Sequence, residues 1–132
     1  GKKDSSFNLN QYIEEHLEYL ELEGFKIEKE ITISSVQLQL DLSMMKRMMD
    51  NICSNIQKYA RKEQPIYLQI SIEKGNLKIV FENEKKETNH EVESNKIGLK
   101  SVKKIIEIHQ GQCFIQDLMD SFILIITFPC YL

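Results

Sequence analysis

The chain has 132 residues and a formal net charge of −3, with 42% hydrophobic and 28% charged residues. This composition excludes a disordered segment and fits one soluble domain that is long enough to bury its own core. The acidic balance argues against a nucleic-acid partner, and no apolar run approaches the roughly 20 residues of a membrane span.

The first half of the chain predicts two helices separated by two strands. Apolar residues recur at helical spacing from about Leu9 to Glu23. Alternation of apolar and polar residues then indicates a half-buried strand from Phe25 to Ile33 and a short one from Val36 to Leu40. The longest helix follows from Leu42 to Arg61, with Asp41 as a possible cap.

The second half predicts two hairpins with a loop and a helix between them. A tight turn joins the first pair of strands, and a polar stretch without periodicity then indicates a loop. In chain order, the elements are the strands Ile66 to Glu73 and Leu77 to Phe81, the loop Glu84 to Asn95, the helix Ile97 to His109, and the strands Cys113 to Leu118 and Phe122 to Phe128.

This order of elements predicts the fold class. Strands outnumber helices, and the later strands come as hairpins, which favours a mixed, mostly antiparallel sheet. We therefore expect an α+β protein built as a two-layer sandwich, with the helices packed on one face of the sheet. Residues 1–132 are expected to form a single domain.

Two asparagines and a lysine form an unusual stripe on the long helix. Asn51, Asn55 and Lys58 fall at i, i+4 and i+7, so they share one side of the helix, beside its apolar face. Asparagine is a poor helix former, but its carbonyl oxygen suits Mg²⁺, and a lysine suits phosphate oxygens. A stripe of this kind indicates either a metal–phosphate site or asparagines that tie the helix to neighbouring loops.

A second candidate lies at Gly98, where the polar loop leads into the last helix. The start of a helix presents free N–H groups and the positive end of the helix dipole, which together attract anions such as phosphate. Alone, the glycine is equally typical of a simple turn.

Together these stretches resemble the GHKL family of ATP-binding domains, and within it the catalytic domain of bacterial sensor histidine kinases. Residues 50–60 resemble the N-box of the family. Gly98-Leu99 and the residues after them, to Gly111, resemble its second glycine box and helix, and Pro129 resembles the proline that ends its last strand. The resemblance spans about Leu9 to Pro129 and implies the Bergerat-type ATP-binding fold.

The resemblance also implies roles for individual residues. Asn55 would coordinate Mg²⁺ with the support of Asn51, Lys58 would approach the phosphates, and Tyr59 would line the nucleotide pocket. Gly98 and Leu99 would belong to the nucleotide site as well. The cofactors implied are ATP and Mg²⁺.

The first glycine box departs from the family pattern. The family usually has Asp-x-Gly-x-Gly where this chain has Asn83-Glu84-Lys85-Lys86-Glu87, without a glycine. Asn83 stands at the aspartate that reads adenine, and its amide can still accept from an amino group and donate to a ring nitrogen. The lost glycines normally let the backbone approach the ligand closely. The polar loop is also short for a lid that folds over ATP.

The histidines and cysteines are expected to have no catalytic role. We interpret His16 as a surface residue, since the phosphoacceptor histidine of the family lies on a separate helical hairpin, and His109 as a helix-end residue favoured by the dipole. Cys53, Cys113 and Cys130 lie far apart, form no CxxC pair and have no metal-ligand spacing to a histidine. We expect them to be reduced thiols.

The function implied is that of a protein-histidine kinase fragment that holds Mg·ATP for transfer to a histidine on the dimerisation domain of the same kinase. That domain and, indirectly, a response regulator would be its partners. The fragment would be a monomeric cytoplasmic part of a membrane-bound receptor. Two alternatives remain: a degenerate GHKL module that binds a protein without nucleotide, and an anti-sigma-factor serine kinase, for which Asp50 would be the acidic residue.

Overall fold

The computed structural model describes residues 3–4, 8–33, 38–86 and 92–130, with residues 3–4 and 92–97 described by their backbone alone. These described residues form three helices and seven strands. In chain order they are β1 (Lys3–Asp4), α1 (Leu9–Leu22), β2 (Ile27–Ile31), β3 (Leu40–Asp41), α2 (Leu42–Tyr59), β4 (Ile66–Glu73), β5 (Asn76–Glu84), α3 (Val92–Ile108), β6 (Gln112–Asp117) and β7 (Ser121–Pro129).

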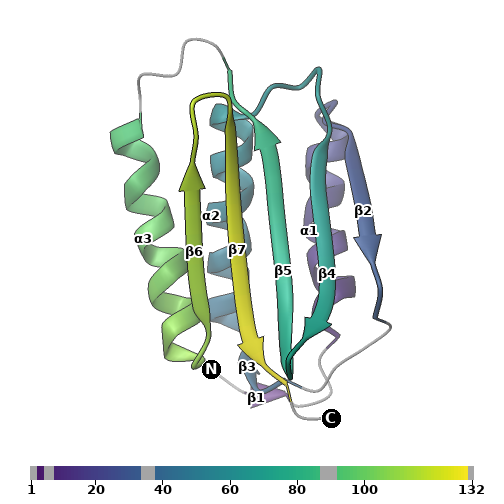
Figure 1. The fold of residues 1–132 in the computed structure, drawn as a ribbon, viewed down its shortest axis with the longest axis vertical. Coiled ribbons are helices and arrows are strands. Elements are labelled where there is room, and N and C mark those ends of the chain that lie inside the picture. The colour runs from purple at the N-terminus through teal and green to yellow at the C-terminus, as the bar shows by residue number, and fades with distance from the viewer. Residues whose placement is uncertain (1–2, 5–7, 34–37, 87–91, 131–132) are drawn as a thin grey trace.

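Five strands form one mixed sheet in the order β2-β4-β5-β7-β6 (Figure 1). The outer strand β2 runs parallel to β4, and every other neighbouring pair in this sheet is antiparallel. A parallel pair needs a long crossover, and here the chain between β2 and β4 supplies α2. The remaining strands, β1 and β3, pair with each other and form a small separate ribbon.

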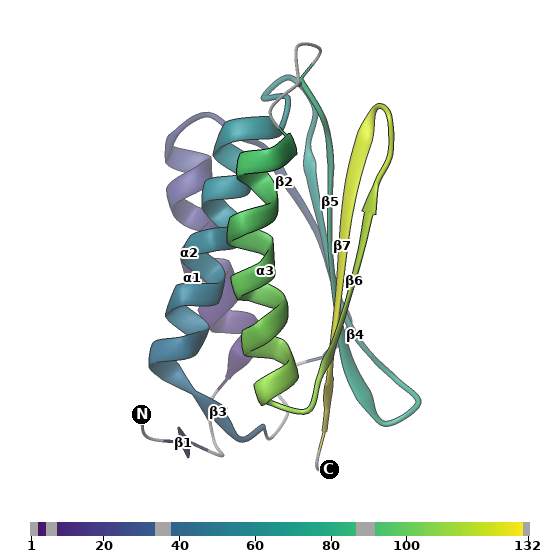
Figure 2. The same ribbon diagram turned by 90° about the vertical axis from the view of Figure 1, so that its left-hand side faces the viewer.

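All three helices cover one face of the sheet, so the domain has two layers (Figure 2). Alternate residues of β5 and β7 are buried beneath the helices, while the residues between them face away. The predicted α+β two-layer sandwich with helices on one face is thus confirmed. Within the described residues, no helix has the length and apolar character to span a bilayer.

Local chemistry explains where the elements begin and end. The Asn8 side chain caps α1 by accepting from the backbone N–H of Gln11. After α1, Gly24 adopts a φ of +102°, a left-handed conformation that favours glycine and ends the helix. Asp41 caps α2. The hydrogen bond from the Ser43 hydroxyl, followed by the one from the backbone N–H of Met44, holds the pKa of the Asp41 carboxyl well below its usual value.

Two predicted boundaries differ most from the structure. The strand expected at Val36 to Leu40 lies partly outside the described residues, and in the described part β3 begins only at Leu40 and pairs with β1. The third helix begins at Val92 rather than Ile97, so it includes the end of the predicted loop Glu84 to Asn95. Periodicity missed this first turn and a half because its sequence, VESNK, has no repeating apolar residues and yet no proline or glycine to prevent a helix.

His109 is a buried structural residue, not a helix-end cation. Its side chain joins the end of α3 to the start of α2: Nε2 accepts from the backbone N–H of Asp41 at 3.1 Å, and Nδ1 lies 2.8 Å from the carbonyl oxygen of Ile105. A carbonyl can only accept, so Nδ1 carries the proton and the ring is neutral. His109 therefore lies at the end of α3 as expected, but its ring stabilises that end through a hydrogen bond to the Ile105 carbonyl rather than as an exposed charge.

We predict that His109→Phe lowers the free energy of unfolding by about 1–3 kcal/mol, because the ring shape is kept while the N–H of Asp41 loses its buried partner. Urea denaturation measures the change. His16→Phe is the matched control. It should change stability by less than about 0.5 kcal/mol, since the side chain of His16 is only part-buried and lies 3.6 Å from an exposed Asp50. Equal losses in both variants would contradict this role for His109.

Candidate functional site

Three elements converge at the upper end of the molecule in Figure 1. There α2 finishes, β5 finishes and α3 begins, so the residues singled out in the sequence gather at one end of the two layers. Asn51, Asn55, Lys58 and Tyr59 come from the later turns of α2, Asn83 from the end of β5, and Gly98 and Leu99 from the early turns of α3.

The asparagine stripe lies on the flank of α2 that faces α3. A different flank of α2 carries Asp50 and Gln57, which line a groove together with residues of α1. At about 100° per residue, Asn51 and Asn55 lie roughly 100–140° around the helix from Asp50, and Lys58 lies roughly 80° from it. Met44, one heptad before Asn51 and on the same stripe, lines a cavity with the last residues of α3, which confirms the direction.

Asn55 carries the most informative atom of the stripe. Its side-chain oxygen is inaccessible to solvent and has no hydrogen-bond partner within the described part of the chain. Burying an unpaired polar atom costs about 1–3 kcal/mol, so native structures rarely leave one without a reason. A carbonyl oxygen in this position is suited to a ligand such as Mg²⁺.

Gly98 is the seventh residue of α3, so the prediction that it precedes the helix was wrong. It shares an inward stripe with Val102, Ile105 and His109, at i, i+4, i+7 and i+11, and these three side chains are buried. A Cβ built on Gly98 would meet no atom within 4 Å. The inner face of α3 therefore has open space at this level, between the upper end of the core and the start of the helix.

Asn83 ends the buried row of β5. Leu77, Ile79 and Phe81 precede it on the same face, and Asn83 is itself only 4% exposed. Its side-chain nitrogen donates to the backbone carbonyl of Glu84 at 3.1 Å. A polar amide thus occupies the last inward position of the central strand, where it can meet a ligand lying between the sheet and the helices.

The other predicted residues differ in exposure. Tyr59 and Leu99 are buried, at 8% and 5% exposure, and belong to the upper end of the core, whereas Lys58 is exposed. Polar side chains therefore gather at the upper end of the molecule, from Asn51, Asn55 and Asn83. Gly98 has no side chain and leaves space at the same end. Most of the polar loop predicted from Glu84 to Asn95, which is short for a lid, lies outside the residues whose side chains are described.

Asp50 and the cysteines belong to other environments. Asp50 lies 2.9 Å from Lys46 and 3.6 Å from His16, in a groove of about 540 Å³ between α1 and α2. Burial, with smaller contributions from nearby carboxylates, raises the pKa of the Cys53 thiol in this groove to about 12, so it is not a reactive thiolate. All three cysteines are free, as expected.

The residues present fit a nucleotide with its metal. The buried oxygen of Asn55 offers a hard ligand without a competing partner, and the open space beside Gly98 leaves room for a ligand close to the helix backbone. Lys58 on the same stripe supplies a positive charge at the rim. Sequence reasoning missed Lys85 and Asp117, which form an ion pair of 2.6 Å at this end of the sheet.

Comparisons with known proteins show the fold. No protein-family model matches the chain, and no curated protein matches it. Among solved structures, the chain is similar to the histidine kinase AdeS of Acinetobacter baumannii, with a TM-score of 0.73 and 17% identity, over 93% of this chain and 65% of that one.

Two catalytic-domain-sized structures match over nearly their whole length. The nucleotide-free catalytic domain of the histidine kinase ThkA has a TM-score of 0.76 and 18% identity, covering 93% of this chain and 94% of that chain. The mycobacterial sensor histidine kinase MprB gives 0.73 and 18%, covering 94% and 95%. The chain therefore has the fold of sensor histidine kinase catalytic domains, as predicted.

We predict that Gly98→Ala raises the free energy of unfolding of the ligand-free protein by about 0.5–1 kcal/mol, because a glycine within a helix is less favourable than alanine and the new Cβ has room. Gly111→Ala is the matched control and should lower stability, since its Cβ would clash with the carbonyl oxygen of Thr127. Chemical denaturation compares the two. A loss of stability in Gly98→Ala would show that the space beside it is filled.

We also predict that Asn55→Ala leaves the stability of the ligand-free protein unchanged or higher, because it removes a buried oxygen without a partner and improves helix propensity. Asn83→Ala should instead lower the free energy of unfolding by about 1 kcal/mol, since it removes a made hydrogen bond. Thermal and urea denaturation of both variants test the contrast, and similar losses would contradict it.

Proposed function

We propose that this chain is the ATP-binding catalytic domain of a sensor histidine kinase, which holds Mg·ATP while the terminal phosphoryl group passes to a histidine on another domain. The observation that carries the proposal is the buried side-chain oxygen of Asn55, on the α2 flank that faces α3, which has no hydrogen-bond partner among the described residues. The fold shared with histidine kinase catalytic domains supports the same conclusion.

Each residue has a distinct part in this proposal. Asn55 provides the Mg²⁺ ligand, Asn51 lies one helical turn before it, and Lys58 neutralises phosphate charge at the rim. Asn83 receives the base at the end of β5, while Tyr59 and Leu99 supply apolar surface beneath it. Gly98 lets the phosphates approach the α3 backbone. The bound Mg²⁺ would itself neutralise charge that develops on the phosphate oxygens.

The chain's own contribution to phosphoryl transfer is positioning. A histidine nitrogen is already a nucleophile, so no general base is required from this domain. The partner would be the dimerisation domain with the phosphoacceptor histidine, and the response regulator would act after it. Such a domain would work on the cytoplasmic side of a membrane receptor, as a monomeric unit within the larger kinase.

One observation favours the alternative of a protein-binding module without nucleotide. That alternative rests on the sequence alone, in which Lys85 and Glu87 stand where the family pattern has glycines. The serine-kinase alternative has less support, because Asp50, its acidic residue, lies in the groove with α1, away from the asparagine stripe. The two remaining functions differ in whether the domain binds nucleotide at all.

We predict that ATP or ADP with Mg²⁺ raises the melting temperature of the domain, because a ligand present at about 100 times its dissociation constant adds roughly 2.7 kcal/mol of stability. For a domain of this size the shift should be several degrees. A thermal-shift titration with and without Mg²⁺ measures it. Asn55→Ala should remove the Mg²⁺-dependent part of the shift without loss of ligand-free stability.

Asp50→Asn is the matched control on the other flank of α2 and should keep the full shift. A cooperative melt without any shift at millimolar nucleotide would reject ATP binding by this domain and favour the protein-binding module. Loss of the shift in Asp50→Asn alone would favour the serine-kinase alternative.

A further inference from the structure

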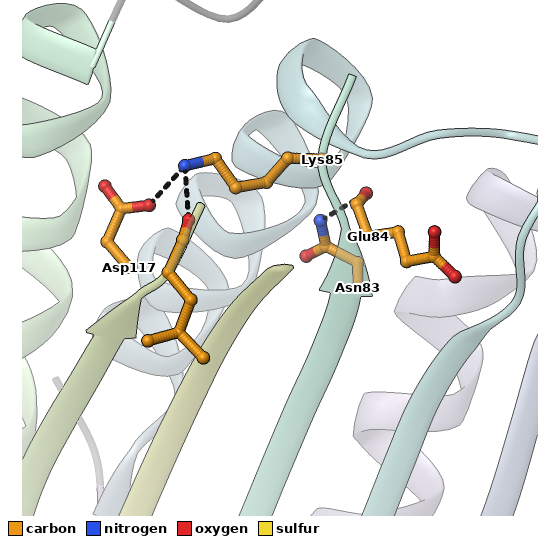
Figure 3. A network of polar contacts seen from close by, with 5 residues as sticks. Asn83, Glu84, Lys85 and Asp117 are labelled. Atoms are coloured by element: carbon orange, nitrogen blue, oxygen red, sulfur yellow. Dashed lines mark hydrogen bonds and ion pairs between the residues drawn. The ribbon is translucent and has the colours of Figure 1, made fainter. Parts of the chain in front are cut away.

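Lys85 is held by two contacts at the top of the sheet. Its ammonium donates to the carboxylate of Asp117 at 2.6 Å and to the backbone carbonyl of Leu118 at 2.9 Å (Figure 3). Its side chain is 11% exposed and that of Asp117 is 31% exposed. The lysine therefore links the end of β5 to the end of β6, across the start of the intervening strand β7.

The backbone around Lys85 is fixed on two sides as well. The N–H of Lys85 donates to Asp120 in the β6–β7 turn at 2.9 Å. On the other side, the N–H of Lys86 donates to Tyr59 at the end of α2, also at 2.9 Å. The residues after β5 are thus hydrogen-bonded to both α2 and the last hairpin, at positions where the family pattern has flexible glycines.

The hydrogen bonds that fix the backbone after β5 also set the orientation of the Asn83 amide. The carbonyl of Glu84 accepts both the N–H of Arg61 at 2.9 Å and the side-chain nitrogen of Asn83 at 3.1 Å. Because a carbonyl accepts and cannot donate, the nitrogen end of the amide must face it. The oxygen end is directed the other way, as Figure 3 shows, and is left to accept a hydrogen bond.

We propose that Lys85 is a positioning residue that determines base selectivity. By holding the end of β5 through Asp117 and Leu118, it keeps the carbonyl of Glu84 in place and so presents the Asn83 oxygen as an acceptor. An acceptor at this point recognises a purine with a 6-amino group and disfavours one with a 6-keto group. This inference rests on the proposed nucleotide site and specifies how that site chooses its base.

The physical basis is the difference in backbone conformational freedom between a glycine and a paired lysine at position 85. A glycine at position 85 would leave the strand end with many backbone conformations, and the Asn83 amide could then turn either end toward a ligand. The paired lysine restricts that freedom before the ligand binds, so selectivity comes from preorganisation rather than from a contact with the base. Asn83 would touch the base, and Lys85 would act through it.

The test compares the dissociation constants for ATP and inosine triphosphate, which differ by the amino and keto groups at position 6, each with Mg²⁺. The wild-type protein should prefer ATP by at least about tenfold, the value of one well-made hydrogen bond. Lys85→Met keeps the apolar stem and loses the charge, and should reduce this preference to less than about threefold. Asp117→Asn should act in the same direction, and serves as the second variant if Lys85→Met does not fold.

Two further variants separate positioning from general effects of charge. Lys85→Arg keeps a donor for Asp117 and should retain most of the preference. Lys78→Met is the matched control, because Lys78 lies on the same strand, near its other end, in an ion pair of 3.5 Å with Glu73. It should leave the preference unchanged. Thermal melts confirm that each variant is folded.

The outcomes distinguish the two proposals. If the wild type prefers ATP and both the Lys85→Met and Asp117→Asn variants keep that preference, the positioning role is overturned while nucleotide binding stands. If the wild type binds both nucleotides equally, the Asn83 acceptor is overturned and nucleotide binding again stands. If the wild type binds neither, the proposed function fails and the selectivity role fails with it.

Discussion

The structure depends on rows of side chains that point inward from both layers. Each strand of the sheet contributes alternate residues to the core, and each helix contributes a stripe at helical spacing. At the upper end of the molecule the rows continue but their chemistry changes. On β5 the row Leu77, Ile79, Phe81 ends in Asn83, and on α3 the buried stripe reaches Gly98, where no side chain fills the space. The candidate site is the part of the core that was left polar and open.

This origin explains how much of the molecule the sequence could predict. Alternation and helical spacing located all three helices and the five strands of the main sheet, because these signals come from the same burial that holds the layers together. In the small ribbon, β1 was missed and β3 was predicted with the wrong bounds, since two-residue strands have no period to detect. The start of α3 was missed because VESNK has no apolar repeat.

The candidate site was only partly predictable, for a related reason. Asn51, Asn55 and Lys58 were found from their spacing, and the structure places them on the flank of α2 that faces α3. That spacing could not reveal that the oxygen of Asn55 is buried without a partner, because burial depends on the neighbouring elements. Lys85 was visible in the sequence only as a missing glycine. Its partner Asp117 is far along the chain, and a single sequence gives no signal for such a pair.

The parallel pairing of β2 with β4 has a consequence for the order of folding. The strands from β4 onward pair as antiparallel neighbours, and two of these pairs are short hairpins that close with little loss of chain entropy. In contrast, β2 reaches β4 only after the whole of α2 has been placed between them. Contacts between distant segments form slowly, so we expect β2 to join last and, as an edge strand, to detach first in local opening. The antiparallel part of the sheet, which contains β5 and β7, would then keep its shape while β2 opens and closes at the edge.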